Sequence, residues 1–313
     1  MEVFASCGVG FKCIQVEEVQ HMNAHTEART ITSSPLPGFG VEVRLDLSLP
    51  IDEPTREALR QLRATHHLMV FRGQNLSFEQ QKDLMSTFGP LLESFGDGFG
   101  YVSNDRADGQ LGSGELHFHS DLDFSPLGAY YMISLQAIEV ANGATSTVFA
   151  NCVHAFERLP AEIRDKIYGL DAFDVASPHA GGLKLNTEQP KCVHPVVRHV
   201  PVTGRPALFV SKCTTDRILG LSYDESSELL EALWDCLYDP IHLYEQHWHV
   251  GDLVVWDNRA CQHRRDAFDP NVPRTLQRVT CAEPHSGFYD AFPQFSRDDF
   301  GSQYEGGDLS VGA

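Results

Sequence analysis

The sequence predicts an α+β protein in which a few helices pack on a core rich in strands. Three segments, 52–62, 77–89 and 224–234, have the pattern of short helices. Short apolar runs typical of buried strands concentrate at 130–150 and 193–280. A chain of 313 residues with 42% hydrophobic content can bury a large core, and one domain of this size is the simpler interpretation.

Local signals support each of these elements. The segment 52–62 has an acidic first turn that contains a proline, followed by apolar residues three apart. In the segment 77–89, Ser77 and Gln80 have the spacing of a capping box, and Gly89 marks an end. The runs 67–71 and 253–256 consist of apolar residues with no polar interruption after the first position, which indicates buried strands.

Candidate metal ligands occur at His119 and Asp121. In an extended segment, residues two apart point to the same side, so both side chains can grip one ion. Residues 117–124 alternate as a strand does. A His-X-Asp triplet alone is weak, because the chain has fifteen histidines and an isolated triplet is more often a surface turn or a polar pair.

The downstream context strengthens the metal prediction. The turn formers Asp257 and Asn258 end the apolar strand 253–256, so His263 follows a rigid element that can hold a ligand. Two imidazoles and one carboxylate cover one face of an octahedral ion and leave three positions open, as in non-haem Fe(II) oxygenases. Arg274 lies eleven residues after His263, and Arg278 lies four residues further on. On a strand this even spacing puts both guanidiniums on one face; the alternative is a solvated pair on a sheet surface.

In order and spacing, these blocks resemble the taurine dioxygenase and 2,4-dichlorophenoxyacetate dioxygenase family of Fe(II)/2-oxoglutarate-dependent enzymes, over about residues 38–280. The resemblance implies a double-stranded β-helix, a jelly roll whose mouth holds the metal. It implies that His119, Asp121 and His263 bind iron and that Arg274 pairs with the distal carboxylate of 2-oxoglutarate. With O2 as second cosubstrate, such an enzyme releases succinate and CO2 while it oxidises a C–H bond.

Another block carries a cosubstrate residue by the same resemblance. Residues 139–151 are similar to the family segment in which a Gly-Gly-X-Thr run precedes a Phe-Ala pair. Aligned on Phe149 and Ala150, the threonine that binds 2-oxoglutarate falls on Thr147. Because Ala144 and Thr145 replace the glycine pair, Thr145 is a second candidate.

The resemblance also indicates a small, anionic organic substrate that is hydroxylated or desaturated. Arg278 stands where the taurine enzyme binds the anionic group of its substrate, so we expect a carboxylate, sulfonate or sulfate; a structural salt bridge is the alternative. Glu115 replaces a substrate-binding Asn, and can pair with a cationic amine or face solvent. Phe118 replaces a Trp often found before the first iron-binding His. The further predicted cavity residues are Lys212, Cys213 and Phe268.

Two other classes of protein can use the same residues. A zinc hydrolase can bind its metal through two imidazoles and a carboxylate, with an activated water in the open position. It has no use for Arg274 and Thr147 around a diacid, however. A non-catalytic jelly-roll binding protein is the second alternative. The resemblance argues against a halogenase, because related halogenases give up the carboxylate that Asp121 retains here.

Composition excludes several partners. The formal net charge of −19 and the absence of a basic patch argue against nucleic acid, so an anionic substrate needs local arginines. The eight cysteines show no disulfide or metal spacing and read as reduced thiols. No apolar run is long enough to span a membrane, and the N-terminus lacks the basic region of a secretory signal. We therefore expect a cytoplasmic protein without membrane partners, and a homo-oligomer is compatible with the sequence.

Residues 1–37 lie outside the resemblance and are predicted to be an N-terminal extension, either a disordered tail, an extra strand or the product of an upstream start codon. A junction rich in Ser, Pro and Gly separates it from one catalytic domain at 38–313. The glycine-rich segment 109–114 precedes His119 and is predicted to be a mobile lid.

Overall fold

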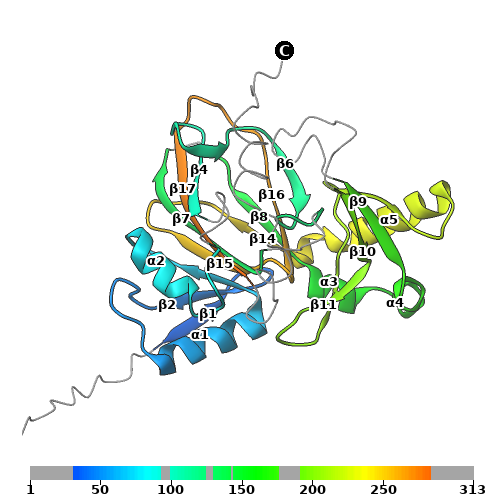
Figure 1. Ribbon diagram of the computed structural model, residues 1–313, viewed down its shortest axis with the longest axis horizontal. Helices are drawn as coiled ribbons and strands as arrows, with labels where there is room; N and C mark the ends of the chain where they lie inside the picture. The colour runs from blue at the N-terminus through cyan, green and yellow to red at the C-terminus, as the bar shows by residue number, and fades with distance from the viewer. Residues whose placement is uncertain (1–30, 93–98, 125–129, 142–143, 176–190, 283–313) are drawn as a thin grey trace, which may run out of the picture.

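The structure is a computed structural model that describes residues 31–92, 99–124, 130–141, 144–175 and 191–282. Two β-sheets face each other at its centre, in the strand orders β1-β2-β3-β15-β7-β17-β4-β5 and β14-β8-β16-β6 (Figure 1). Phe149 of the smaller sheet meets Trp256 of the larger one edge to face, with ring centroids 5.2 Å apart. This is the predicted jelly roll. The strands are β1 (Thr32–Pro35), β2 (Val41–Arg44), β3 (Leu68–Phe71), β4 (Phe99–Ser103), β5 (Gly109–Leu111), β6 (Leu116–His119), β7 (Met132–Val140), β8 (Thr147–Asn151), β14 (Leu243–Gln246), β15 (Leu253–Asp257), β16 (Cys261–Arg265) and β17 (Arg274–Cys281).

Both faces of the larger sheet are buried, which explains the uninterrupted apolar runs in its sequence. Along β15, Val254 and Trp256 point into the core between the two sheets, whereas Leu253 and Val255 pack in a second cluster with the helices outside. The same alternation in β17 turns residues 274, 276 and 278 inward. The inner face therefore carries two arginines around a leucine, at one end of an otherwise apolar core.

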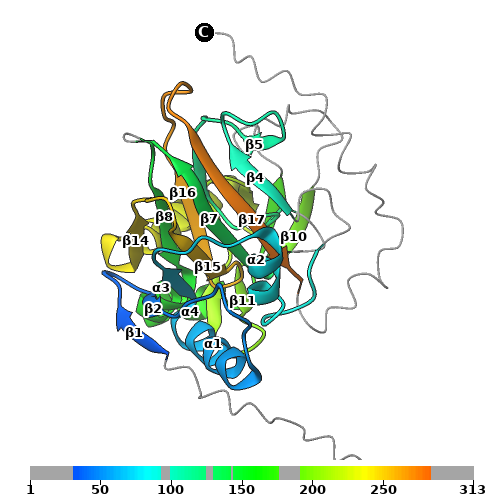
Figure 2. The same cartoon turned by 90° about the vertical axis from the view of Figure 1, so that its left-hand side faces the viewer.

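The three predicted helices are confirmed, with shifted ends. α1 begins within the predicted segment, where Asp52 caps it, continues past residue 62, and ends where His67 adopts a left-handed conformation. α2 has the predicted Ser77–Gln80 capping box and ends before the predicted Gly89. α1 and α2 cover the outer face of the larger sheet (Figure 2). The helices are α1 (Glu53–His66), α2 (Phe78–Met85), α3 (Cys152–Arg158), α4 (Ala161–Ile167), α5 (Tyr223–Leu237) and the 3-10 turn η1 (Pro240–His242).

A second layer of structure packs beyond the smaller sheet (Figure 1). Helices α3 and α4 were not predicted, because they are short and Asn151, the cap of α3, lies at the end of a strand. The predicted strand, turn and strand at 194–198 and 201–210 correspond to three short strands. The strands of this layer are β9 (Asp171–Val175), β10 (Lys191–Pro195), β11 (Val197–His199), β12 (Pro206–Leu208) and β13 (Thr215–Ile218).

The larger sheet begins before residue 38. β1 lies inside the segment predicted to be an extension and pairs with β2 at the edge of the sheet. Residues 1–30 of that segment lie outside the described part of the chain. Among the described residues, the structure contains no helix with the length and apolar character to cross a membrane.

Asp174 on β9 is a buried carboxyl within this second layer. It is 2% exposed, and its Oδ1 accepts a hydrogen bond of 2.6 Å from the Thr215 hydroxyl. Its Oδ2 has no hydrogen-bond partner among the described residues. Burial raises the pKa of Asp174 to about 7, against the Thr215 hydrogen bond, which lowers it.

This raised pKa predicts a pH-dependent stability. Between pH ~4, where Asp174 ionises in the unfolded chain, and pH ~7, the folded chain holds the extra proton, so the free energy of unfolding falls as the pH rises. Asp174→Asn keeps the acceptor for Thr215 and removes the titration. We expect urea unfolding to show the variant gaining about 2–3 kcal/mol relative to wild type between pH 5 and pH 8. Asp216→Asn, at an exposed position of β13, is the control; an equal gap at both pH values would contradict the prediction.

Candidate metal and cosubstrate site

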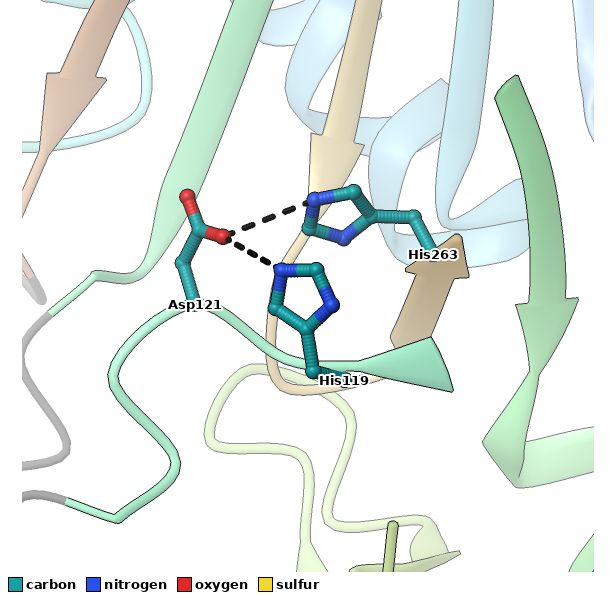
Figure 3. A group of neighbouring side chains, drawn as sticks. All are labelled: His119, Asp121 and His263. Atoms are coloured by element: carbon teal, nitrogen blue, oxygen red, sulfur yellow. Dashed lines mark ion pairs between the residues drawn. The ribbon is translucent and has the colours of Figure 1, made fainter. Parts of the chain in front are cut away.

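The smaller sheet brings the two candidate histidines together. His263 on β16 is the direct antiparallel partner of His119 on β6, and on its other side it is paired with Phe149 of β8. Asp121 follows β6 by two residues and turns back toward both imidazoles (Figure 3). Residues 144 positions apart in the chain thus share one small volume because two strands are neighbours in register.

The geometry of these three side chains suits one metal ion. The Oδ1 of Asp121 lies 3.3 Å from His119 Nε2 and 3.5 Å from His263 Nε2. The three ligand atoms all lie within 4.8 Å of one another. Adjacent ligands about 2.1 Å from an octahedral ion are about 3 Å apart, so small side-chain movements bring all three into bonding range.

Hydrogen bonding fixes which nitrogen of His119 faces the site. Its Nδ1 lies 2.7 Å from the carbonyl oxygen of His117, which can only accept, so Nδ1 carries a hydrogen, and in the neutral ring Nε2 has the lone pair that a metal needs. The ring of His263 stacks on Phe149 with centroids 6.0 Å apart and contacts Trp256. Its Nδ1 is buried without a hydrogen-bond partner in the described chain. Aromatic packing, rather than a hydrogen bond, therefore orients this second imidazole.

Electrostatics favour a carboxylate and a neutral imidazole at the centre. Burial opposes ionisation of Asp121, but the hydrogen bond with His119 and nearby positive charge outweigh it and hold the pKa below its usual range. Burial disfavours the charged form of His119, but the same contact with Asp121 outweighs burial and raises that pKa. Burial and the neighbouring His119 lower the pKa of His263 to about 3, which leaves its lone pair available for a metal.

Asn258 holds the backbone of Asp121, a role that the sequence did not reveal. Its Oδ1 accepts from the Asp121 N–H at 3.0 Å, and its Nδ2 donates to the Asp121 carbonyl at 3.0 Å and to the Tyr130 carbonyl at 3.1 Å. Asn258 is 3% exposed and follows Asp257, which forms a buried ion pair with Arg63. The sequence predicted only a turn at Asp257 and Asn258. We call this hold of Asn258 on the Asp121 backbone the Asn258 clamp. An Asn among the turn formers that end a strand before a metal ligand is the sequence signal that could have identified it.

A second group of side chains surrounds a buried guanidinium. Arg274, the first residue of β17, is 2% exposed, and its Nη2 donates to the Thr147 hydroxyl at 3.2 Å. Trp248 donates to the same hydroxyl at 3.0 Å. The structure thus brings Thr147 to Arg274, whereas Thr145 lies before β8 and its hydroxyl is 3.4 Å from the carbonyl oxygen of Ser146.

Arg278 lies on β17 four residues after Arg274. It faces inward as Arg274 does, is 7% exposed, and its Nη2 donates to Gln110 Oε1 at 2.7 Å. Its positive charge lowers the pKa of Asp121 and of His263, although less than burial and the direct neighbours affect them. The predicted common face for the two arginines is therefore confirmed.

Other predicted cavity residues lie elsewhere. Phe118 lies on the opposite face of β6 from His119, and its ring stacks on Tyr238 of the second layer at 4.2 Å. Alternation along the strand explains why a residue adjacent to a ligand points away from it. The Lys212 ammonium lies over the rings of Trp234 and Tyr238 and 3.7 Å from Glu231, so it faces α5.

The structure gives surroundings for the three remaining predicted cavity residues, Glu115, Cys213 and Phe268. Glu115 is exposed, and its Oε1 lies 3.2 Å from Nδ1 of His117. Cys213 is buried, and burial with the nearby charge of Asp123 raises the pKa of its thiol to about 12. Phe268 lies under the guanidinium of Arg265 at 5.2 Å.

Residues 109–114, predicted to be a lid, are instead held by Arg265. Residues 109–111 form β5, and the Arg265 guanidinium donates to the carbonyl oxygens of Leu111, Gly112 and Gly114. Arg265 is 4% exposed, and its burial lowers its pKa to about 10. Three bonds from one buried cation anchor this segment beside the site.

The fold and the site define a jelly-roll protein with two histidines and one carboxylate around a common point, and a buried arginine beside them. Comparison with known families gives the same result. Residues 32–280 match the model described as "Taurine catabolism dioxygenase TauD, TfdA family". The chain belongs to this family of 2-oxoglutarate-dependent dioxygenases, and like its members it uses Fe(II), 2-oxoglutarate and O2.

Relatives support this assignment. The chain is 29% identical to an α-ketoglutarate-dependent 2,4-dichlorophenoxyacetate dioxygenase from Cupriavidus pinatubonensis, over 79% of this chain and 94% of that protein. It is 30% identical to an α-ketoglutarate-dependent sulfate ester dioxygenase from Pseudomonas putida, over 78% and 86% respectively. The crystal structure of AAD-2 in complex with Mn(II) and N-oxalylglycine matches with a TM-score of 0.72 at 27% identity, covering 82% of this chain and 98% of that one.

The Asn258 clamp predicts a loss of metal affinity when it is removed. Asn258→Ala deletes three hydrogen bonds, two of which fix the backbone of Asp121, so we expect Mn(II) to bind about 10–100-fold more weakly in calorimetric titration. Asn271→Ala, in an exposed loop where the side chain donates to Asp269, is the matched control. Unchanged metal affinity in a folded Asn258→Ala protein would show that the clamp does not position the ligand.

Proposed function

We propose that this dioxygenase oxidises a C–H bond of a small anionic organic substrate at an iron held by His119, Asp121 and His263. A single observation carries the proposal: the jelly roll holds two features at one mouth. One is the compact group of two imidazole nitrogens and one carboxylate oxygen, and the other is the buried Arg274, which pairs with no carboxylate among the described residues. The first group suits Fe(II), and the second suits the far end of a diacid.

The donor set fits the metal. Nε2 of His119 is available because its Nδ1 is committed to a backbone carbonyl, and Asp121 is held as a carboxylate. Three protein ligands on one side leave the opposite side for substrates. Bound iron supplies the oxidising chemistry, with 2-oxoglutarate as the source of two electrons and O2 as the oxidant.

The cosubstrate would be oriented by residues of two different sheets. Arg274 on β17 can pair bidentately with the distal carboxylate of 2-oxoglutarate, and Thr147 on β8 can add a hydrogen bond. Both side chains are at most 3% exposed, so water is excluded and the charge interaction is strong. An uncompensated buried cation also makes the pocket selective for an anion.

The substrate anion is assigned to Arg278. This arginine faces inward, and its positive charge contributes to the lowered pKa of Asp121, which supports a guanidinium near the reacting centre. Two relatives are named for 2,4-dichlorophenoxyacetate and for a sulfate ester, both of which are anionic small molecules. A carboxylate or sulfate bound at Arg278 would direct a neighbouring C–H bond toward the iron. Hydroxylation and desaturation both remain compatible with these residues.

The activity itself is the direct test. With Fe(II), 2-oxoglutarate and air, a panel of aryloxyacetates, alkyl sulfates and their neutral analogues should include an anion that stimulates succinate release. His263→Ala should abolish release because it removes one metal ligand, whereas His247→Ala, at an exposed position, should not. A hydrolase would form product without O2 or succinate, and a non-catalytic binding protein would form none.

The proposed role of Arg278 predicts that its removal affects the KM for the substrate but not the Kd of 2-oxoglutarate. Arg278→Gln should raise the KM for the anionic substrate by about 10–100-fold, the effect of one or two lost charge-assisted hydrogen bonds. The Kd of 2-oxoglutarate should stay within about twofold, because Arg274 binds it. Arg217→Gln, which removes an exposed arginine paired with Asp216, is the control. An equal loss of substrate and 2-oxoglutarate binding would place Arg278 in the cosubstrate pocket instead.

A further inference from the structure

Trp248 lies against the group formed by Arg274 and Thr147, although no sequence motif pointed to it. It follows β14 by two residues, and β14 is the antiparallel partner of β8, with Gln246 opposite Thr147. The indole is 7% exposed and lies 5.9 Å from the Arg274 guanidinium carbon. Its single polar atom, Nε1, donates to the Thr147 hydroxyl at 3.0 Å.

Within the described part of the chain, the Thr147 hydroxyl forms two hydrogen bonds. A hydroxyl oxygen has two acceptor positions and one hydrogen to donate. Nε1 of Trp248 and Nη2 of Arg274 can only donate, so these two contacts occupy both acceptor positions. No acceptor for the Thr147 hydrogen occurs among the described residues, and the side chain is 3% exposed. The hydroxyl hydrogen is therefore left for a ligand that accepts.

The Arg274 guanidinium beside the Thr147 hydroxyl also needs a partner that accepts. Arg274 forms no ion pair in the part of the chain that the structure describes, and its Nε is buried without a hydrogen-bond partner. Burial, with the charge of the nearby Arg265, lowers the pKa of Arg274 to about 9. The hydroxyl thus requires an acceptor and the guanidinium requires a negative charge, and one carboxylate supplies both.

We propose that Trp248 is a positioning residue that, through its indole N–H, makes Thr147 an obligate donor and so sets the preference of this pocket for a 2-oxo acid with a distal carboxylate. This inference rests on the proposed function of Arg274 and Thr147 as the 2-oxoglutarate anchor. Without the indole N–H, the hydroxyl regains a free acceptor position and can rotate away from the ligand. Selectivity between diacid and monoacid then decreases, while the metal-binding end of the pocket is unaffected.

The test compares two ligands of the Mn(II)-loaded full-length chain by calorimetry, without turnover. One is 2-oxoglutarate, and the other is 2-oxopentanoate, which has the same chain length but no distal carboxylate. Trp248→Phe keeps an aromatic ring and removes only the N–H. We expect it to weaken 2-oxoglutarate binding about five- to tenfold, roughly the effect of one hydrogen bond, and to leave 2-oxopentanoate binding unchanged. Trp234→Phe is the matched control, because its indole Nε1 is buried without a partner in the described structure.

A double variant tests whether Trp248 affects 2-oxoglutarate binding through the Thr147 hydroxyl. Thr147→Val should weaken 2-oxoglutarate binding by itself, and Trp248→Phe added to it should cause no further loss if Trp248 acts through the hydroxyl. Additive losses, equal losses for both ligands, or no loss in Trp248→Phe would overturn the inference. Arg274→Gln separates this from the proposed function. If Arg274→Gln leaves 2-oxoglutarate binding intact, the anchor itself is misassigned, whereas a large loss there with an unaffected Trp248→Phe refutes only the role of Trp248.

Discussion

The pairing of β6 with β16 is the constraint on which the site depends. It places His119 opposite His263, and no local feature of either segment could do so. A shift of one residue in this register would turn one imidazole to the other face of the sheet and destroy the ligand group. The register is held by burial on the outward face, where Phe118 stacks on Tyr238, and by β8 on the other edge of β16.

The position of Asp121 is not fixed by strand pairing, because this residue lies beyond the end of β6. Its neighbour Leu122 has a left-handed backbone, with φ of 58°, which takes the chain out of the strand direction. Asn258 imitates the missing strand partner by bonding both the N–H and the carbonyl of Asp121. The buried ion pair of Arg63 and Asp257 fixes the turn that presents Asn258. Because Arg63 belongs to α1, this helix on the outside of the larger sheet supports the loop that carries Asp121. Such a pair is costly to bury, and its value here lies in the geometry that it specifies.

Much of this arrangement could be predicted from sequence, and the exceptions have physical causes. Ligand types and their spacing identified the metal group, and an even spacing on a strand identified the inward face for Arg274 and Arg278. Phe118 was predicted as a cavity residue, but strand alternation points it away from the ligand next to it. Asn258 and Trp248 escaped prediction because their partners, Asp121 and Thr147, are about a hundred residues or more away in the chain. Contacts of that kind depend on the sheet topology, which local patterns do not encode.

A crystal structure of the full-length chain grown without O2, with Mn(II) in place of iron and with 2-oxoglutarate, tests the central claim most directly. We predict one metal bonded to Nε2 of both histidines and to the Asp121 carboxylate, with the distal carboxylate of the diacid between Arg274 and Thr147. A metal bound elsewhere, or a diacid whose distal carboxylate lies away from Arg274, would contradict the assignment of the site.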